Sequence, residues 1–221
     1  MSDVTSQAAE FLRVLDLASV VVFAVTGALV ASRKQMDIVG FMWMGVITGV
    51  GGGTLRDLLL DAPVFWIVDP TPLALCLCAA GLVHFSAHLL ASRYRFLLYL
   101  DAFGMALVTT VGTAKALDMG TGALVAVGMG VVTAAVGGIL RDILGQEPSI
   151  LLRRDIYVTA AVCGSVTYVL ADAFGLPGPA TTALAIGAGF GLRACAIRFD
   201  LFLPIFRPRP GRMPGHRGEV E

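Results

Sequence analysis

Long apolar runs separated by short polar connections make up most of the chain. A run of about 20 apolar residues is long enough to cross a bilayer as an α-helix, at about 1.5 Å of rise per residue. The connections concentrate proline, glycine and aspartate, which are typical of turns. The pattern therefore predicts seven transmembrane helices, at residues 11–32, 36–60, 72–91, 96–116, 121–145, 156–174 and 180–203.

The composition supports the same fold class. Of the 221 residues, 57% are hydrophobic and 14% are charged, whereas a soluble domain carries about 25% charged residues. We therefore expect an all-α integral membrane protein. The formal net charge is zero, which predicts no binding to nucleic acid. No nucleophile, phosphate-loop or metal motif is evident, so we expect neither an enzyme nor a cofactor or bound metal.

A segment of the second predicted helix recurs 85 residues later. The glycines and the Arg-Asp pair of residues 52–57 return at residues 137–142, and residues 15–16, 27, 31, 44–45, 48 and 63 are also repeated at this offset. Each copy contains three predicted helices, an odd number, so the second copy must cross the membrane in the opposite direction. We predict an inverted repeat of 3+3 helices, residues 11–91 and 96–174, followed by a seventh helix within 180–204. Such repeats place a substrate or ion path at their interface.

Glycines interrupt two of the predicted helices. Gly51, Gly52 and Gly53 lie in the second helix, and Gly137 and Gly138 lie in the fifth. Glycine costs about 1 kcal/mol relative to alanine in a helix and lets the backbone bend. Close helix packing would need glycine on one face only, whereas three consecutive glycines point around the whole helix. We therefore predict that helices 2 and 5 are kinked, with exposed carbonyl oxygens that suit a cation.

Charged residues inside the apolar helices form a second pattern. Such residues are expensive in a membrane and usually pair or line a hydrated cavity. Asp16 and Arg56 are expected in the outer half of the membrane, where we predict that they face each other. The repeat predicts the same for Asp101 and Arg141 in the inner half. Two further carboxylates are expected to join these clusters, Asp57 and Asp142. Two interpretations stay open: charges that line a path, or structural ion pairs between helices.

Three other polar side chains are candidates for the same path. Thr48 and Thr133 lie about one turn before the glycines, so their hydroxyls either line the path or bond back to their own helix. Lys115 lies near the outer end of the fourth helix. It either extends to the membrane interface or projects into the path and regulates the passage of ions.

The basic residues predict the orientation. They gather after the first, third, fifth and seventh helices, and positive residues favour the cytoplasmic side. Residues 1–10 are therefore expected outside the cytoplasm. The tail at 205–221 is rich in proline, glycine and arginine, which predicts a disordered cytoplasmic segment near anionic membrane lipids.

The segments at residues 51–59, 63–67 and 137–142 resemble the prokaryotic branch of the trimeric intracellular cation (TRIC) channel family, also called the bacterial glycine transporter domain family. The resemblance covers residues 12–204. It implies a homotrimer in the plasma (inner) membrane of a prokaryote. It also implies a pore in each subunit, between helices 1–3 and 4–6, that conducts monovalent cations, mainly potassium.

From the repeat and the resemblance together we predict a potassium channel that conducts passively, with potassium or sodium as permeant ions. The alternative is a secondary transporter of a small amino acid such as glycine, because inverted repeats with broken helices also serve transporters.

Overall fold

The structure is a computed structural model, and it describes residues 2–90, 94–147 and 156–204. The elements assigned in these ranges are α-helices, one of them only four residues long. They are α1 (Ser2–Arg33), α2 (Ile38–Leu59), α3 (Phe65–Val68), α4 (Thr71–Leu90), α5 (Tyr94–Asp118), α6 (Ala123–Leu144), α7 (Val158–Ala173) and α8 (Gly178–Phe199). The all-helical class predicted from the sequence is confirmed.

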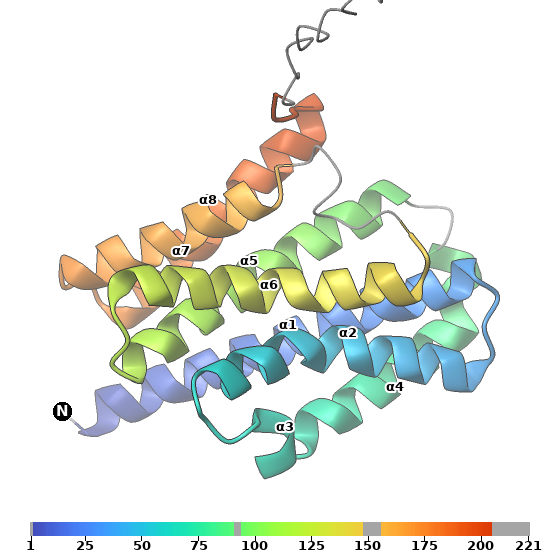
Figure 1. Cartoon of the computed structure of the whole chain (residues 1–221), viewed down its shortest axis with the longest axis horizontal. Helices are drawn as coiled ribbons and strands as arrows, with labels where there is room; N and C mark the ends of the chain where they lie inside the picture. The colour runs from blue at the N-terminus through green and yellow to red at the C-terminus, as the bar shows by residue number, and fades with distance from the viewer. Residues whose placement is uncertain (1, 91–93, 148–155, 205–221) are drawn as a thin grey trace, which may run out of the picture.

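The helices form two groups of three long helices that lie against each other (Figure 1). In the first group α1 packs on α2 and α4, and in the second α5 packs on α6 and α7. The groups meet where α2 contacts α6 and α1 contacts α5, and α8 packs on α7 and α5. The second group therefore repeats the packing of the first.

The turns repeat with the same offset. After α1, Gln35 has a φ of 54°, and 85 residues later Gly120 has a φ of 77°. After α2, Asp61 has a φ of 52°, and its counterpart Gln146 has a φ of 50°. These left-handed positions are unfavourable for most side chains. Their recurrence indicates that the loops of the two groups have the same backbone geometry.

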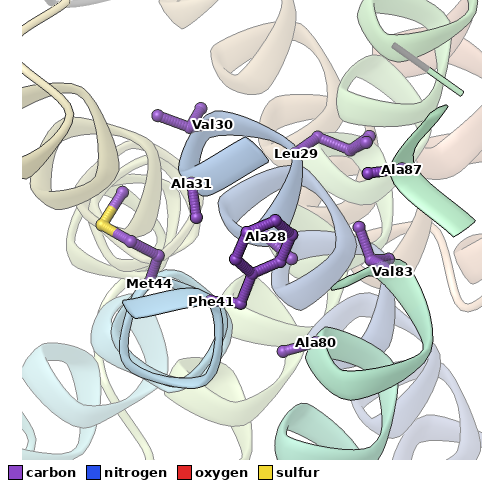
Figure 2. Close-up of a cluster of buried hydrophobic side chains, with 9 residues drawn as sticks. All are labelled: Ala28, Leu29, Val30, Ala31, Phe41, Met44, Ala80, Val83 and Ala87. Atoms are coloured by element: carbon purple, nitrogen blue, oxygen red, sulfur yellow. The ribbon is translucent and has the colours of Figure 1, made fainter. Parts of the chain in front are cut away.

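A small-residue core joins the three long helices of the first group (Figure 2). Phe41 and Met44 of α2 lie against the alanines and valines of α1 and α4. In a membrane the hydrophobic effect between helices is weak, so close packing of small residues must hold them together. The buried members of this cluster are Ala28, Leu29, Val30, Ala31, Phe41, Met44, Ala80, Val83 and Ala87.

By length and composition, four helical segments within the described ranges can cross a membrane: Glu10–Arg33, Ile38–Leu59, Ala123–Leu144 and Gly178–Phe199. The apolar segments Thr71–Ala87 and Val158–Ala173 are shorter. The number of crossings therefore stays a prediction.

The helix boundaries differ from the prediction in two places. The first helix begins at Ser2 rather than at residue 11, so residues 2–10, expected as a separate leading segment, continue α1. The connection after α2 contains the additional helix α3. The predicted tail at 205–221 lies outside the described residues.

Candidate functional site

Buried charges gather at the C-terminal end of α6. Nη1 of Arg141 lies 2.8 Å from Oδ1 of Asp101 on α5, and its Nη2 lies 2.9 Å from Oδ1 of Asp142. Nη1 also donates to the hydroxyl of Thr26 on α1, at 3.3 Å. We call these four residues the Arg141 cluster. Its guanidinium is therefore held by both three-helix groups.

A related set of charges lies at the C-terminal end of α2. Nε of Arg56 donates to Oδ1 of Asp57 at 2.7 Å, and Nη1 lies 4.0 Å from Oδ1 of Asp16 on α1. The Lys115 ammonium, from α5 of the other group, lies 2.8 Å from the same Oδ1 of Asp57. We call these four residues the Arg56 cluster. The predicted pairing of each arginine with the aspartate of its own repeat is confirmed, as is the membership of both neighbouring aspartates.

The two clusters differ in how completely the arginine is satisfied. The Arg56 side chain is only 1% exposed, yet its Nη1 has no hydrogen-bond partner among the described residues. Its counterpart Nη1 on Arg141 reaches both an aspartate and Thr26. At the offset of 85 the residue equivalent to Thr26 is Val111, which has no acceptor. The valine in place of a threonine and the longer distance to Asp16 together leave Nη1 of Arg56 without a hydrogen bond.

The contact between α2 and α6 places the clusters at opposite ends of the bundle. Thr48 lies against Gly137, and Gly52 lies against Thr133. Residue numbers therefore rise along α2 while those of the partners on α6 fall, which means that the two helices run antiparallel. The middle of this crossing lies halfway between Thr48 and Gly52 on α2 and halfway between Thr133 and Gly137 on α6, and each arginine lies six residues further along its own helix. At about 1.5 Å per residue, the arginine Cα atoms are about 18 Å apart along the helix axes.

The glycines make this crossing possible. A Cβ on Gly52 would lie 2.0 Å from the Thr133 carbonyl oxygen, and one on Gly137 would lie 2.6 Å from the Thr48 carbonyl oxygen. Each of α2 and α6 is one continuous α-helix through its glycines, so the structure has no break that would release carbonyl oxygens there. The predicted exposure of carbonyl oxygens is therefore absent from α2 and α6, and the glycines allow close backbone packing instead. A bend at these positions stays a prediction.

The remaining glycines of the motif have different neighbours. A Cβ on Gly51 would meet the end of the Leu140 side chain at 2.8 Å, and one on Gly53 would meet the ring of Phe65 at 2.7 Å. Gly138 has only the Arg141 guanidinium nearby, at 3.8 Å. The three consecutive glycines of α2 thus meet two elements, α6 at Gly51 and Gly52 and α3 at Gly53, which explains why glycine is not confined to one face.

Both predicted threonines are buried and bond back to their own helix. The hydroxyl of Thr48 donates to the Met44 carbonyl at 2.6 Å, and that of Thr133 donates to the Met129 carbonyl at 2.5 Å. The sequence left two interpretations open, hydroxyls that line the path or hydroxyls that bond back to their own helix. This conformation matches the second one.

Lys115 reaches across to the first three-helix group. Its ammonium is held by the buried carboxylate of Asp57, while 31% of its side chain stays exposed. No pattern in the sequence predicts this contact, because the two residues are 58 positions apart and belong to different repeats. Thr26 was missed for the same reason. Among the described residues, no group of three His, Cys, Asp or Glu side chains could hold a metal ion.

These features define a helical membrane protein with two related halves and a buried charge cluster at each end. A family model described as "Glycine transporter" matches the chain twice, at residues 13–88 and 98–173. The chain belongs to this family, which is the TRIC channel family. The two matched segments cover most of the two three-helix groups, so the comparison finds the same repeat as the packing.

Relatives of this chain are bacterial membrane proteins. The UPF0126 inner membrane protein YadS of Escherichia coli strain K12 is 38% identical over 195 residues, which cover 87% of this chain and 94% of YadS. A UPF0126 membrane protein of Vibrio cholerae is 36% identical over 201 residues, covering 88% of this chain and 82% of that protein.

Solved structures of similar chains are TRIC channels. The TRIC trimeric intracellular cation channel orthologue from Rhodobacter sphaeroides is 48% identical with a TM-score of 0.84, covering 86% of this chain and 99% of that one. A further TRIC cation channel structure is 29% identical with a TM-score of 0.80, and the match covers 90% of this chain and 98% of that one.

Proposed function

We propose that the chain is a channel that conducts monovalent cations, chiefly potassium, passively along a path in each subunit between the two three-helix groups. The observation that carries this proposal is the 48% identity and TM-score of 0.84 to the Rhodobacter sphaeroides cation channel orthologue over 86% of the chain. The charge clusters support it, because buried charges in membrane helices usually mark an ion path.

The Arg56 cluster would form the outer end of this path, in the orientation that the basic residues predict. The Asp16 side chain is 20% exposed and Lys115 is 31% exposed, so both can act on an approaching ion. The carboxylate attracts a cation and the ammonium repels it. The Arg141 cluster, where the paired side chains are only 10–11% exposed, would form the inner end.

We take the described conformation as a closed one. The backbones of α2 and α6 touch at Gly52 and Thr133, which leaves no room for an ion between these residues. Conduction would require the two helices to separate or bend at their glycines, after which Thr48 and the glycine carbonyls would border the path. Continuous helices held only by close packing can separate without losing their internal hydrogen bonds.

We further propose a homotrimer in the plasma (inner) membrane. The support is the trimeric channel orthologue from Rhodobacter sphaeroides and the inner membrane relative from Escherichia coli. Exposed apolar side chains on the described helices, such as Leu82 at 72% and Phe85 at 74%, suit contact with lipid or a neighbouring subunit.

Recordings from purified protein in a planar bilayer under a potassium gradient test the proposal. We expect unitary currents that Asp16→Asn reduces and that Asp118→Asn, which removes an equal charge from an exposed helix end, leaves unchanged. The absence of unitary currents over a wide voltage range would refute the channel.

The name of the matching family model supports one second candidate, a transporter of glycine. A transporter would take up glycine into liposomes with saturation and counterflow, without unitary currents.

A further inference from the structure

The short helix α3 is fixed to the end of α2 by two hydrogen bonds of different kinds. The backbone N–H of Phe65 donates to Oδ2 of Asp57 at 3.0 Å. The indole N–H of Trp66 donates to the hydroxyl of Thr54 at 2.8 Å. That hydroxyl itself donates to the Val50 carbonyl at 2.7 Å, so the threonine is held in the orientation that accepts the indole.

The ring of Phe65 is packed against the same end of α2. It occupies the space beside Gly53, where a Cβ would lie 2.7 Å from the ring. The guanidinium carbon of Arg56 lies 5.7 Å from the ring centroid, within the range of a cation–π contact. The helix α3 therefore covers the buried arginine of the Arg56 cluster, and we call residues 65–68 the cap.

The cap is connected to the other three-helix group through the carboxylate of Asp57. Asp57 is fully buried and uses both of its oxygens: Oδ2 accepts from the cap, and Oδ1 accepts from Arg56 and from Lys115 of α5. Movement of the cap would remove the donor to Oδ2 and leave the carboxylate held at Oδ1 alone, so that its orientation would be less constrained. The Lys115 contact, which joins α5 to α2, depends on that orientation.

The indole bond has no equivalent in the second repeat. At the offset of 85, Ile139 corresponds to Thr54, and isoleucine cannot accept a hydrogen bond. The device therefore belongs to the Arg56 cluster alone. This is also the cluster whose arginine has an unbonded nitrogen.

We propose that Trp66 and Thr54 are positioning residues of the channel. Their hydrogen bond holds the cap on the Arg56 cluster, keeps the Asp57 carboxylate facing Lys115, and thereby stabilises the closed form. This inference rests on the proposed function. It adds that the cap, rather than the charge cluster alone, sets how often the path opens.

Single-channel recording of Thr54→Val and Trp66→Phe tests the proposal. Each variant removes one side of the indole bond and leaves the charged residues intact. We expect the ratio of open to closed time to rise about five-fold, as expected when a hydrogen bond of about 1 kcal/mol is lost from the closed form only. The unitary conductance should stay unchanged, because neither side chain would border the path. Thr54→Ser keeps the hydroxyl and should restore the wild-type ratio.

Thr167→Val is the matched control. Its hydroxyl also donates to a carbonyl four residues earlier, that of Cys163 at 2.8 Å on α7, but no described hydrogen bond joins it to a tryptophan. We expect this variant to gate as the wild type does.

The outcomes separate the two proposals. A silent wild type would overturn the channel. A conducting wild type whose open ratio is unchanged in both Thr54→Val and Trp66→Phe would overturn the cap. Fluorescence gives a reading that does not need currents, because the chain has only two tryptophans. In a Trp43→Phe background, Thr54→Val should make Trp66 more accessible to iodide, and unchanged quenching would also overturn the cap.

Discussion

Asp101 and Asp16 are equivalent in the repeat but hold their arginines very differently. Oδ1 of Asp101 lies 2.8 Å from Nη1 of Arg141, and these side chains are 10% and 11% exposed. Oδ1 of Asp16 lies 4.0 Å from Nη1 of Arg56, and its side chain is 20% exposed. The same change from aspartate to asparagine should therefore destabilise the fold by different amounts in the two clusters.

The contacts give the expected magnitudes. Removing one partner of a buried ion pair costs about 3–5 kcal/mol. Arg141 keeps Asp142 at 2.9 Å, so we expect the lower limit, about 3 kcal/mol, for Asp101→Asn. For Asp16→Asn, where the pair is longer and partly exposed, we expect about 0–1 kcal/mol. For a chain of this size, 1 kcal/mol corresponds to about 2–4 °C in Tm. We therefore expect Tm to fall by about 6–12 °C for Asp101→Asn and by at most about 4 °C for Asp16→Asn.

Thermal unfolding of the two variants and the wild type, purified in one mild detergent, measures these differences. All scans must use one heating rate, because unfolding of a membrane protein in detergent is commonly irreversible and Tm then depends on the rate. Equal decreases in Tm, or a larger decrease for Asp16→Asn, would show that the contacts in the two clusters do not determine stability as argued.

Three further predictions concern other parts of the chain. Gly52→Ala should lower Tm by an amount equivalent to about 1–3 kcal/mol, because its Cβ would overlap a carbonyl of α6. Gly128→Ala, which has nothing within 4 Å, should not lower it, and equal decreases would contradict this. Lys115→Met should raise the fraction of time that single channels are open, because it removes the ammonium that ties α5 to α2; an unchanged fraction would count against the contact. The Thr71 hydroxyl holds the pKa of Asp69 below its ordinary value of 3.8, so the stabilisation is present above that value and is lost as the pH falls through the lower, folded pKa. The Tm difference between wild type and Asp69→Asn should be constant from about pH 7 to pH 5 and shrink below about pH 4.

The doubled motif was sufficient to predict the pairing of each arginine with the aspartate of its own repeat and the presence of the neighbouring aspartate in both clusters. Asp101 and Arg141 are 40 residues apart, yet the fixed offset and the odd number of helices per copy place them together. Periodicity and composition likewise predicted the helical class. These inferences succeed because they depend on patterns that persist over whole helices rather than on single contacts.

The cross-repeat contacts could not be predicted in the same way. Lys115 meets Asp57, and Thr26 meets Arg141, only because the two halves pack face to face, and neither pair is related by the offset. The short helix α3 is too brief for its apolar pattern to be distinguished from a loop. The glycines predict a kink with exposed carbonyl oxygens because their backbone freedom is visible in the sequence, whereas the carbonyl that approaches Gly52 is not.

Inverted repeats would make the two ends of the protein equivalent if the sequences were identical, but the copies differ, and two of the differences decide how each cluster is joined to the other half. Val30 stands where the second copy has Lys115, and Val111 stands where the first copy has Thr26. The Arg56 cluster is therefore joined to the other half by a partly exposed ion pair, and the Arg141 cluster by a buried hydroxyl. A partly exposed ion pair is weakened by salt, whereas a buried hydrogen bond to an uncharged hydroxyl is screened far less. We infer that regulation acts at the Arg56 cluster while the Arg141 cluster holds the two halves in register.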